Sequence, residues 1–295
     1  MKKRPFIGYV LSGGAARGFV HIGFLKAMEE EGIKPDVLAG VSMGGIIASL
    51  YALEPSWKFV YEKIKESIER KTFKKLGFDI FTKEEKNIFK RFHDAIIERV
   101  SLAKAFWSES VVPFENVEGA AYEIFGNLKF EDLKIKTLLT AFDLVRNEYV
   151  YINRGYIKDA VIATTAIPGL LPPLKKDGRM LIDGGVVSNS PVIFLKKIYS
   201  PRLIITSRLK NIVEYKKDFK GSYEFYQRIL QFHRLKYENI ELQNSDITIT
   251  IDTHNLLWSD FEKLDEFVEK GYLFTKNLIK EIKRKILIKK ILFWI

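Results

Sequence analysis

A serine between two glycines is the residue of this chain whose surroundings most directly suggest chemistry. Gly40-Val41-Ser42-Met43-Gly44 matches the pattern G-x-S-x-G and lies between a short apolar run and a segment of small, apolar residues. On a sharp turn from a strand to a helix, the serine is exposed at the end of the sheet, and Gly40 and Gly44 permit the tight backbone. The start of such a helix also directs amide dipoles at developing negative charge. The pattern predicts a nucleophile at Ser42, with a chance glycine-rich turn as the alternative.

A second glycine-rich loop, with the sequence SGGAARG, runs from Ser12 to Gly18 after an apolar run and at the start of a helical pattern. Its small residues allow several backbone N–H groups to converge, which suits an oxyanion hole for acyl transfer. A dinucleotide-binding turn is the alternative. It is disfavoured because Ala15 replaces the middle glycine of G-x-G-x-x-G, and because Asp36 precedes the second predicted strand instead of ending it.

A third motif is an aspartate followed by two glycines. Asp183-Gly184-Gly185 comes directly after the apolar run Met180–Ile182. An aspartate at the end of a strand, with flexible residues behind it, can be directed into a site. Taken by itself, the segment is more simply explained as an ordinary Asp-Gly turn.

In their order and spacing, the three motifs together resemble the patatin-like phospholipases. The resemblance covers about residues 5–208 and includes the runs 159–173 and 186–191, whereas little is similar beyond Ser207. Three motifs in one order are more specific than any one of them. The resemblance implies a serine acyl-ester hydrolase, a phospholipase A or lysophospholipase, with no metal and no organic cofactor.

The resemblance also implies a Ser–Asp dyad, with Ser42 as the nucleophile and Asp183 as its general base. A carboxylate is a weak base for a hydroxyl, so proton transfer should accompany the attack while the loop stabilises the oxyanion as it forms. Water activated by the same aspartate would then release the acyl group from the serine.

The early glycine-rich loop takes its roles from the same resemblance. The implied oxyanion donors are the N–H groups of Gly13, Gly14 and Ala15. Arg17 and Gly18 would support the loop, or Arg17 would contact an anionic group. Ala15 stands where many members have glycine. Its N–H keeps the oxyanion role if the loop needs no positive φ at that position.

A Ser–Asp–His triad is the rival arrangement, because histidine is the commonest catalytic base. His233 and His254 follow Asp183, as in an α/β-hydrolase esterase, whereas His21 lies on the first predicted helix. His233 has apolar and basic neighbours and His254 lies in a polar turn, so the dyad is favoured. With no cysteine and no histidine pair at H-x-x-x-H spacing, we expect no metal site.

The formal net charge of +11 favours an anionic partner. No zinc finger, RNA-recognition signature or helix-turn-helix pattern is present, so we expect a lipid or ester substrate and no nucleic acid. The tail Lys276–Ile295 has apolar and basic residues largely on opposite helical faces. Such a helix can lie on an anionic membrane surface, or it can pack against its own domain or a second subunit. A non-catalytic lipid-binding or regulatory protein at the membrane surface is the alternative function.

The order of the elements predicts an α/β fold, a three-layer sandwich with a mainly parallel central sheet and helices on both faces. We expect residues 5–208 to form the core, with a helical insertion near 56–115 where charges and aromatics alternate, and 209–295 to add a strand and helices to the same domain. The predicted strands are 6–11, 37–41, 137–143, 148–152, 180–182, 202–206 and 247–251, and the predicted helices include 16–32, 44–53 and 159–165.

The beginning of the chain imitates a signal peptide, with a basic head and an apolar run. That run, Phe6–Leu11, is short and ends at glycines where a secretory segment would continue, so we interpret it as a buried strand. The absence of cysteine fits a reducing compartment. We therefore expect a cytoplasmic protein, with peripheral attachment to the inner membrane face as a variant of this location.

Overall fold

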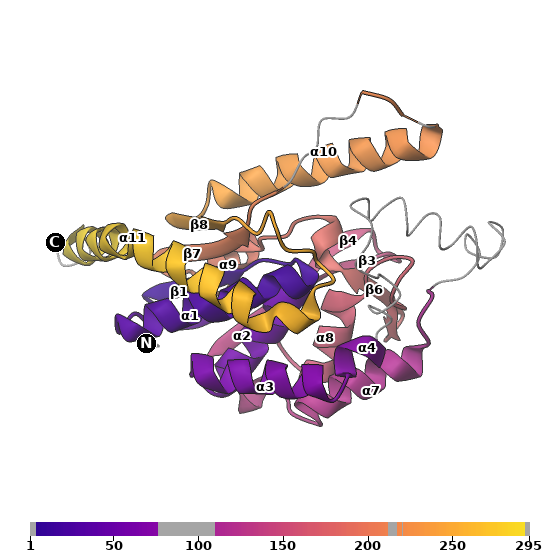
Figure 1. Ribbon diagram of the computed structural model, residues 1–295, viewed down its shortest axis with the longest axis horizontal. Coiled ribbons are helices and arrows are strands. Elements are labelled where there is room, and N and C mark those ends of the chain that lie inside the picture. The colour runs from indigo at the N-terminus through magenta and orange to yellow at the C-terminus, as the bar shows by residue number, and fades with distance from the viewer. Residues whose placement is uncertain (1–3, 76–109, 212–216, 220, 293–295) are drawn as a thin grey trace.

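The computed structural model describes residues 4–75, 110–211, 217–219 and 221–292 (Figure 1). Much of the predicted helical insertion, residues 76–109, lies outside the described residues, as do 293–295 at the end of the tail. On either side of that gap the insertion is helical as expected. It contains α3 (Trp57–Glu69) and α4 (Thr72–Lys75) before the gap, and α7 (Phe114–Phe125) after it.

A single eight-stranded sheet forms the centre of the molecule. Its order is β5-β6-β3-β2-β1-β7-β8, and β4 pairs with β3 outside this path. The five strands from β3 to β8 in that order are mutually parallel, whereas β4, β5 and β6 pair antiparallel. The strands are β1 (Ile7–Leu11), β2 (Val37–Gly40), β3 (Lys136–Asp143), β4 (Glu148–Ile152), β5 (Leu174–Lys176), β6 (Arg179–Asp183), β7 (Leu203–Leu209) and β8 (Ile247–Ile251).

Helices cover both faces of the sheet, so the predicted fold class is confirmed. Successive residues of a strand point to opposite faces, and in β1 Tyr9 and Leu11 join the larger apolar core whereas Val10 joins the smaller one. The larger core lies under α1 (Val20–Glu30), α2 (Met43–Leu53), α8 (Ile157–Thr165) and α11 (Leu264–Leu292), and the smaller lies under α9 (Val192–Tyr199). The long helix α10 (Ser222–Leu242) lies beyond α9, at the top of Figure 1.

The C-terminal helix packs against the first helix of the domain. Gly23 in α1 and Gly271 in α11 face each other's helix so closely that an added Cβ would lie 1.9 Å from a backbone oxygen. Ile282 and Ile286 of the predicted amphipathic tail are buried in the larger core. Lys276 forms ion pairs with Glu30 and Glu31 at 3.1 and 2.8 Å. The apolar face therefore packs against the domain, which is the second of the two predicted alternatives, as far as Ile286.

Several elements differ from the sequence prediction; β7, for example, continues to Leu209 instead of ending at residue 206. The helix expected over 16–32 begins as a 3-10 segment, Ala15–Phe19, and becomes α1 only at Val20. The sequence predicts only β6 of the short β5–β6 hairpin. Strand β5 lacks the apolar pattern of a strand, because it has three residues and two of them are exposed lysines. No helix in the described part of the chain is long and apolar enough to cross a membrane.

Candidate active site

Ser42 lies on the sharp turn between β2 and α2, with a backbone conformation that non-glycine residues rarely adopt (φ 52°, ψ −130°). The turn is possible because its glycines allow backbone segments to touch. A Cβ on Gly44 would lie 2.3 Å from the carbonyl oxygen of Leu11, and one on Gly40 would lie 2.5 Å from the carbonyl oxygen of Gly44. Such strained conformations cost on the order of 1–3 kcal/mol and persist only when their surroundings fix them.

A threonine from another helix holds the Ser42 backbone in this conformation. The Ser42 N–H donates to the Thr164 hydroxyl oxygen at 3.0 Å, and that hydroxyl donates to the Thr140 carbonyl oxygen at 2.7 Å. Both threonine side chains are fully buried. Thr164 had not been singled out from the sequence, although it lies within the run 159–173 that carries part of the family resemblance.

Asp183 ends β6 and points toward the nucleophile. Its carboxylate accepts a hydrogen bond from the Gly185 N–H at 2.7 Å and interacts with the Ser42 hydroxyl. Ser42 and Asp183 are only 7% and 6% exposed. Burial raises the pKa of the Asp183 carboxyl to about 6, against the opposing effects of Gly185, Ser42 and the positive charge of Arg234. The side chain is thus a stronger base than an exposed aspartate and still ionised at neutral pH.

The glycine-rich loop lies beside the nucleophile, since a Cβ on Gly13 would be 3.3 Å from the Ser42 Cβ. The Gly13 N–H is already used, because it donates to the Asn189 carbonyl oxygen at 3.2 Å. Within the described residues, the N–H groups of Gly14 and Ala15 have no backbone acceptor. The condition set for Ala15 is not met, because its φ is positive, 49°. Its N–H stays a candidate oxyanion donor, since it has no backbone acceptor among the described residues, but the alanine adopts this conformation at the cost of strain. Gly18 permits close packing of the loop on Met43.

Two pockets that differ in character meet at Ser42. The first is small, about 40 Å³, and is lined largely by apolar side chains from α2, α7 and α8, among them Ile46, Val117 and Val161. The second has a volume of about 350 Å³ and is more polar than the first, with Asp183, Asn189 and the glycine-rich loop in its mixed lining. Both pockets include Ala15, Ser42 and Ile167. A molecule with one apolar and one polar part could therefore place the bond between them at the serine.

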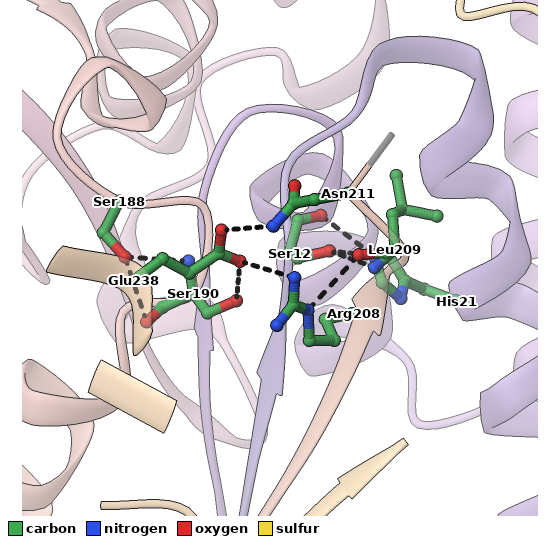
Figure 2. A network of polar contacts seen from close by, with 8 residues as sticks. All are labelled: Ser12, His21, Ser188, Ser190, Arg208, Leu209, Asn211 and Glu238. Atoms are coloured by element: carbon green, nitrogen blue, oxygen red, sulfur yellow. Dashed lines mark hydrogen bonds and ion pairs between the residues drawn. The ribbon is translucent and has the colours of Figure 1, made fainter. Parts of the chain in front are cut away.

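Helix α10 closes the polar pocket with residues that the sequence motifs did not indicate. Gln231, Arg234, Leu235 and Glu238, at the spacing of one helical face, all line it. Figure 2 shows the anchor of this helix. The buried Glu238 carboxylate accepts hydrogen bonds from the Ser190 hydroxyl at 3.1 Å and from the Asn211 amide at 3.0 Å, and Arg208 lies 3.7 Å away.

The histidines considered for a triad lie away from this arrangement. His21 is fully buried and is 2.9 Å from both the Ser207 hydroxyl and the Ser12 carbonyl oxygen, and burial lowers its pKa to about 4. It therefore links Ser12, directly after β1, to Ser207 in β7 as a neutral side chain, and Figure 2 shows its contact with Ser12. His233 and His254 are exposed, and none of these three histidines lines either pocket. His93 is outside the described residues.

Comparisons with known proteins agree with the three motifs. The family model described as patatin-like phospholipase matches residues 9–196. The lysophospholipase nte1 of Emericella nidulans is 30% identical over 192 residues, which are 65% of this chain and 11% of that protein. The neuropathy target esterase sws of Drosophila melanogaster is 26% identical over 304 residues, 94% of this chain and 20% of that protein. The chain thus spans a fifth or less of these relatives.

Solved structures share the fold. VipD from Legionella pneumophila superposes with a TM-score of 0.54 at 16% identity, covering 95% of this chain and 67% of that one. Human GIVD cytosolic phospholipase A2 gives a TM-score of 0.51 at 11% identity, covering 97% of this chain and 60% of that one. At such identities the likeness concerns the fold alone.

Proposed function

This chain belongs to the patatin-like phospholipase family, and from that premise we propose that it hydrolyses a carboxylic ester of a phospholipid or lysophospholipid through a Ser42–Asp183 dyad. The observation that carries the proposal is that the Ser42 and Asp183 side chains line one pocket and interact, and that Ser42 also lines the neighbouring apolar pocket. The relatives of this chain that are named lysophospholipases support the choice of a phospholipid or lysophospholipid as the substrate class.

In the first step, the Ser42 Oγ attacks the ester carbonyl carbon while its proton passes to the Asp183 carboxylate. The tetrahedral oxyanion is stabilised by the N–H groups of Gly14 and Ala15, since the Gly13 N–H is engaged by Asn189. One such donor is typically worth about 10²–10³ in rate. The bond from carbon to the alcohol oxygen then breaks, and Asp183 returns its proton to the leaving alkoxide.

The second step regenerates the serine. A water molecule gives a proton to Asp183 as its oxygen attacks the acyl carbon, and the Ser42 oxygen leaves and takes that proton back. Both steps require the carboxylate to be ionised at the start. The raised pKa of Asp183, about 6, makes it a better proton acceptor than an exposed aspartate.

The two pockets suggest how an amphipathic substrate is oriented. The acyl end next to the ester carbonyl points into the small apolar pocket between α2, α7 and α8, where each CH₂ group that is buried contributes roughly 0.8 kcal/mol. The alcohol half, with its headgroup, occupies the polar pocket beside Asp183 and α10. The ester carbonyl then lies between them at Ser42.

The direct experiment measures fatty-acid release from a lysophosphatidylcholine by wild type, Ser42→Ala, Asp183→Asn and His254→Ala, with folding checked by circular dichroism. The first two variants should lose at least about 10³-fold in kcat, and His254→Ala should match wild type. A folded Ser42→Ala protein with wild-type activity would refute the assignment of the nucleophile. An inactive His254→Ala variant would favour the Ser–Asp–His triad over the dyad. Vesicle binding without any hydrolysis by wild type would favour the lipid-binding role.

A further inference from the structure

Two arginines from distant parts of the chain line the polar pocket beside Ser42. Arg17 belongs to the glycine-rich loop segment and Arg234 to α10. The Nε atom of each is inaccessible to solvent and has no hydrogen-bond partner within the described residues. A buried donor on a charged group loses its interaction with water, so leaving it without an acceptor is costly. Both side chains line the pocket, and no acceptor from the described residues engages either Nε, so their guanidinium groups are available to an anion that enters it.

The two guanidinium groups also repel each other. The pKa of Arg17 is lowered by burial and by the positive charge of Arg234. The nearby carboxylates offset this charge only in part. Arg234 interacts electrostatically with the single charge of Asp183, whereas Glu238 is already paired with Arg208 and bonded to Ser190 and Asn211. The pocket therefore carries excess positive charge that a bound anion would neutralise.

The structure holds Arg234 at the pocket through its own helix. Arg234 lies one turn before Glu238, so both side chains are on the same face of α10. Glu238 is 1% exposed and anchors that face to the end of the sheet through Ser190 and Asn211 (Figure 2). The anchor positions the Arg234 side chain against the wall formed by the glycine-rich loop. Arg234 lies beyond residues 9–196, the part that the family model matches.

We propose that Arg234 and Arg17 together bind one phosphate group, which in the substrate is the phosphodiester of the lipid headgroup, and that Arg234 makes the enzyme prefer phospholipids over neutral esters. The proposal rests on the function proposed above. Guanidinium groups present donors in a planar fork that matches the oxygens of a phosphate, and such charge-assisted hydrogen bonds are stronger than neutral ones. A phosphodiester has one negative charge and two free oxygens to share between two arginines.

The test compares two substrates with the same acyl chain, a lysophosphatidylcholine and a monoacylglycerol, in wild type and Arg234→Gln. The kcat/KM ratio of the first substrate to the second should fall about 10- to 100-fold in the variant, because one charged hydrogen-bond donor is lost. Most of the change should appear in KM. Lys236→Gln is the matched control, since it removes the same charge from an exposed position of α10, and its ratio should stay within about 2-fold of wild type.

An unchanged ratio in Arg234→Gln overturns the proposal, whatever the absolute loss of activity. An equal loss on both substrates with a shifted pH profile also overturns it, because Arg234 would then act only through Asp183. If Arg234→Gln does not fold, Arg234→Lys should still lower the ratio, since it keeps the charge and loses the fork.

A second measurement separates the headgroup from free phosphate. Glycerophosphocholine should inhibit monoacylglycerol hydrolysis by wild type, and Arg234→Gln should relieve that inhibition. If only inorganic phosphate inhibits, the site binds free phosphate and the headgroup assignment is wrong. If wild type hydrolyses neither lipid, the proposed function fails. The anion site is then tested by thermal shift, where glycerophosphocholine should raise the Tm of wild type and not that of Arg234→Gln.

Discussion

The candidate site has two walls, one built from the sheet and one from α10. Different interactions hold these two walls in place. On the sheet side, Ser42 and Asp183 are 7% and 6% exposed, and backbone hydrogen bonds and close glycine contacts fix their positions. On the α10 side, Phe225 and Tyr226 are 49% and 67% exposed, and the helix is anchored by the carboxylates Glu238 and Glu241. In the proposed function, the reacting groups lie on the wall built from the sheet. The side chains that discriminate between substrates lie on α10, which a few polar contacts hold in place.

The largest expected effect falls on the wall built from the sheet. Asp183→Asn should reduce kcat by at least about 10³-fold on every ester, because it removes the base without changing the shape of the site. This contrasts with Arg234→Gln, whose effect should depend on the headgroup. Measuring both variants on the lysophosphatidylcholine and the monoacylglycerol checks the contrast. A headgroup-dependent loss in Asp183→Asn would break the division between the two walls.

The same substitution should raise stability at alkaline pH. Burial raises the pKa of Asp183 from 3.8 to about 6 in the folded protein, so wild type loses stability as pH rises through this window and the buried carboxylate ionises. The cost above pH 7 is on the order of 3 kcal/mol. Asn carries no charge, and Asp183→Asn should therefore gain more in Tm over wild type at pH 8 than at pH 4. An equal difference at both pH values would contradict this account of the buried charge.

The pH dependence of activity depends on the same Asp183 carboxyl group but runs in the opposite direction, since ionisation lowers stability and raises activity. Activity requires the ionised carboxylate, so kcat/KM on the neutral monoacylglycerol should fall about tenfold for each pH unit below about 6. His254→Ala should keep this profile, because His254 does not line the site. A profile that moves with His254 would indicate a histidine base.

A smaller effect is expected when the anchor of α10 is weakened. Glu238→Gln removes the negative charge beside Arg208 and should lower the free energy of unfolding by about 2 kcal/mol. Activity on the lysophosphatidylcholine should fall by more than activity on the monoacylglycerol, because Arg234 loses its position while the dyad does not. Chemical denaturation and the two assays measure these quantities. Equal losses on both substrates would mean that α10 also supports the dyad.

The smallest expected effect concerns the oxyanion loop. Ala15→Gly replaces a residue at a positive φ of 49° by the one that adopts such a conformation without steric cost. The unfolded state of the variant gains entropy, so the net stabilisation should be no more than about 1 kcal/mol. Its Tm should rise by a few degrees at unchanged substrate preference. A falling Tm would show that the alanine methyl group contributes packing that outweighs the strain.

The sheet wall could be predicted from the sequence, because its strands are short apolar runs and its motifs are contiguous. Ser42 and Asp183 were singled out from motifs of five and three consecutive residues, Asp183 only through the family resemblance, and β8 (Ile247–Ile251) was located without error. Helix α10 could not be placed from the sequence, because it has neither a contiguous motif nor the usual apolar pattern. It buries Glu238 and exposes Phe225, so its hydropathy pattern reverses the usual relation between polarity and burial. The role proposed for Arg234 can be inferred only from the structure, in which α10 lies beside Arg17, some two hundred residues earlier in the chain.

Asn189 and Thr164 show a further limit. Asn189 engages the Gly13 N–H with its backbone carbonyl, and Thr164 acts through a hydroxyl that bridges Ser42 and Thr140. Neither interaction requires a residue type that stands out in a sequence, because any residue has a backbone carbonyl and a threonine hydroxyl can bond to nearby backbone at many positions. The tail presented two open alternatives for a similar reason. An amphipathic pattern specifies an apolar face, and only the contacts with α1 show what covers it.

The strained backbone at Ser42 has a consequence for selection experiments. The residue that the reaction needs has φ 52° and ψ −130°, so a glycine there would release strain and abolish the nucleophile. A library of variants screened only for thermal resistance should therefore accumulate inactive proteins with changes at this turn. Natural selection for turnover must remove such variants, because their stability alone gives no reason for their loss. Recovery of stabilised but inactive variants at position 42 would thus identify the nucleophile without any knowledge of the substrate.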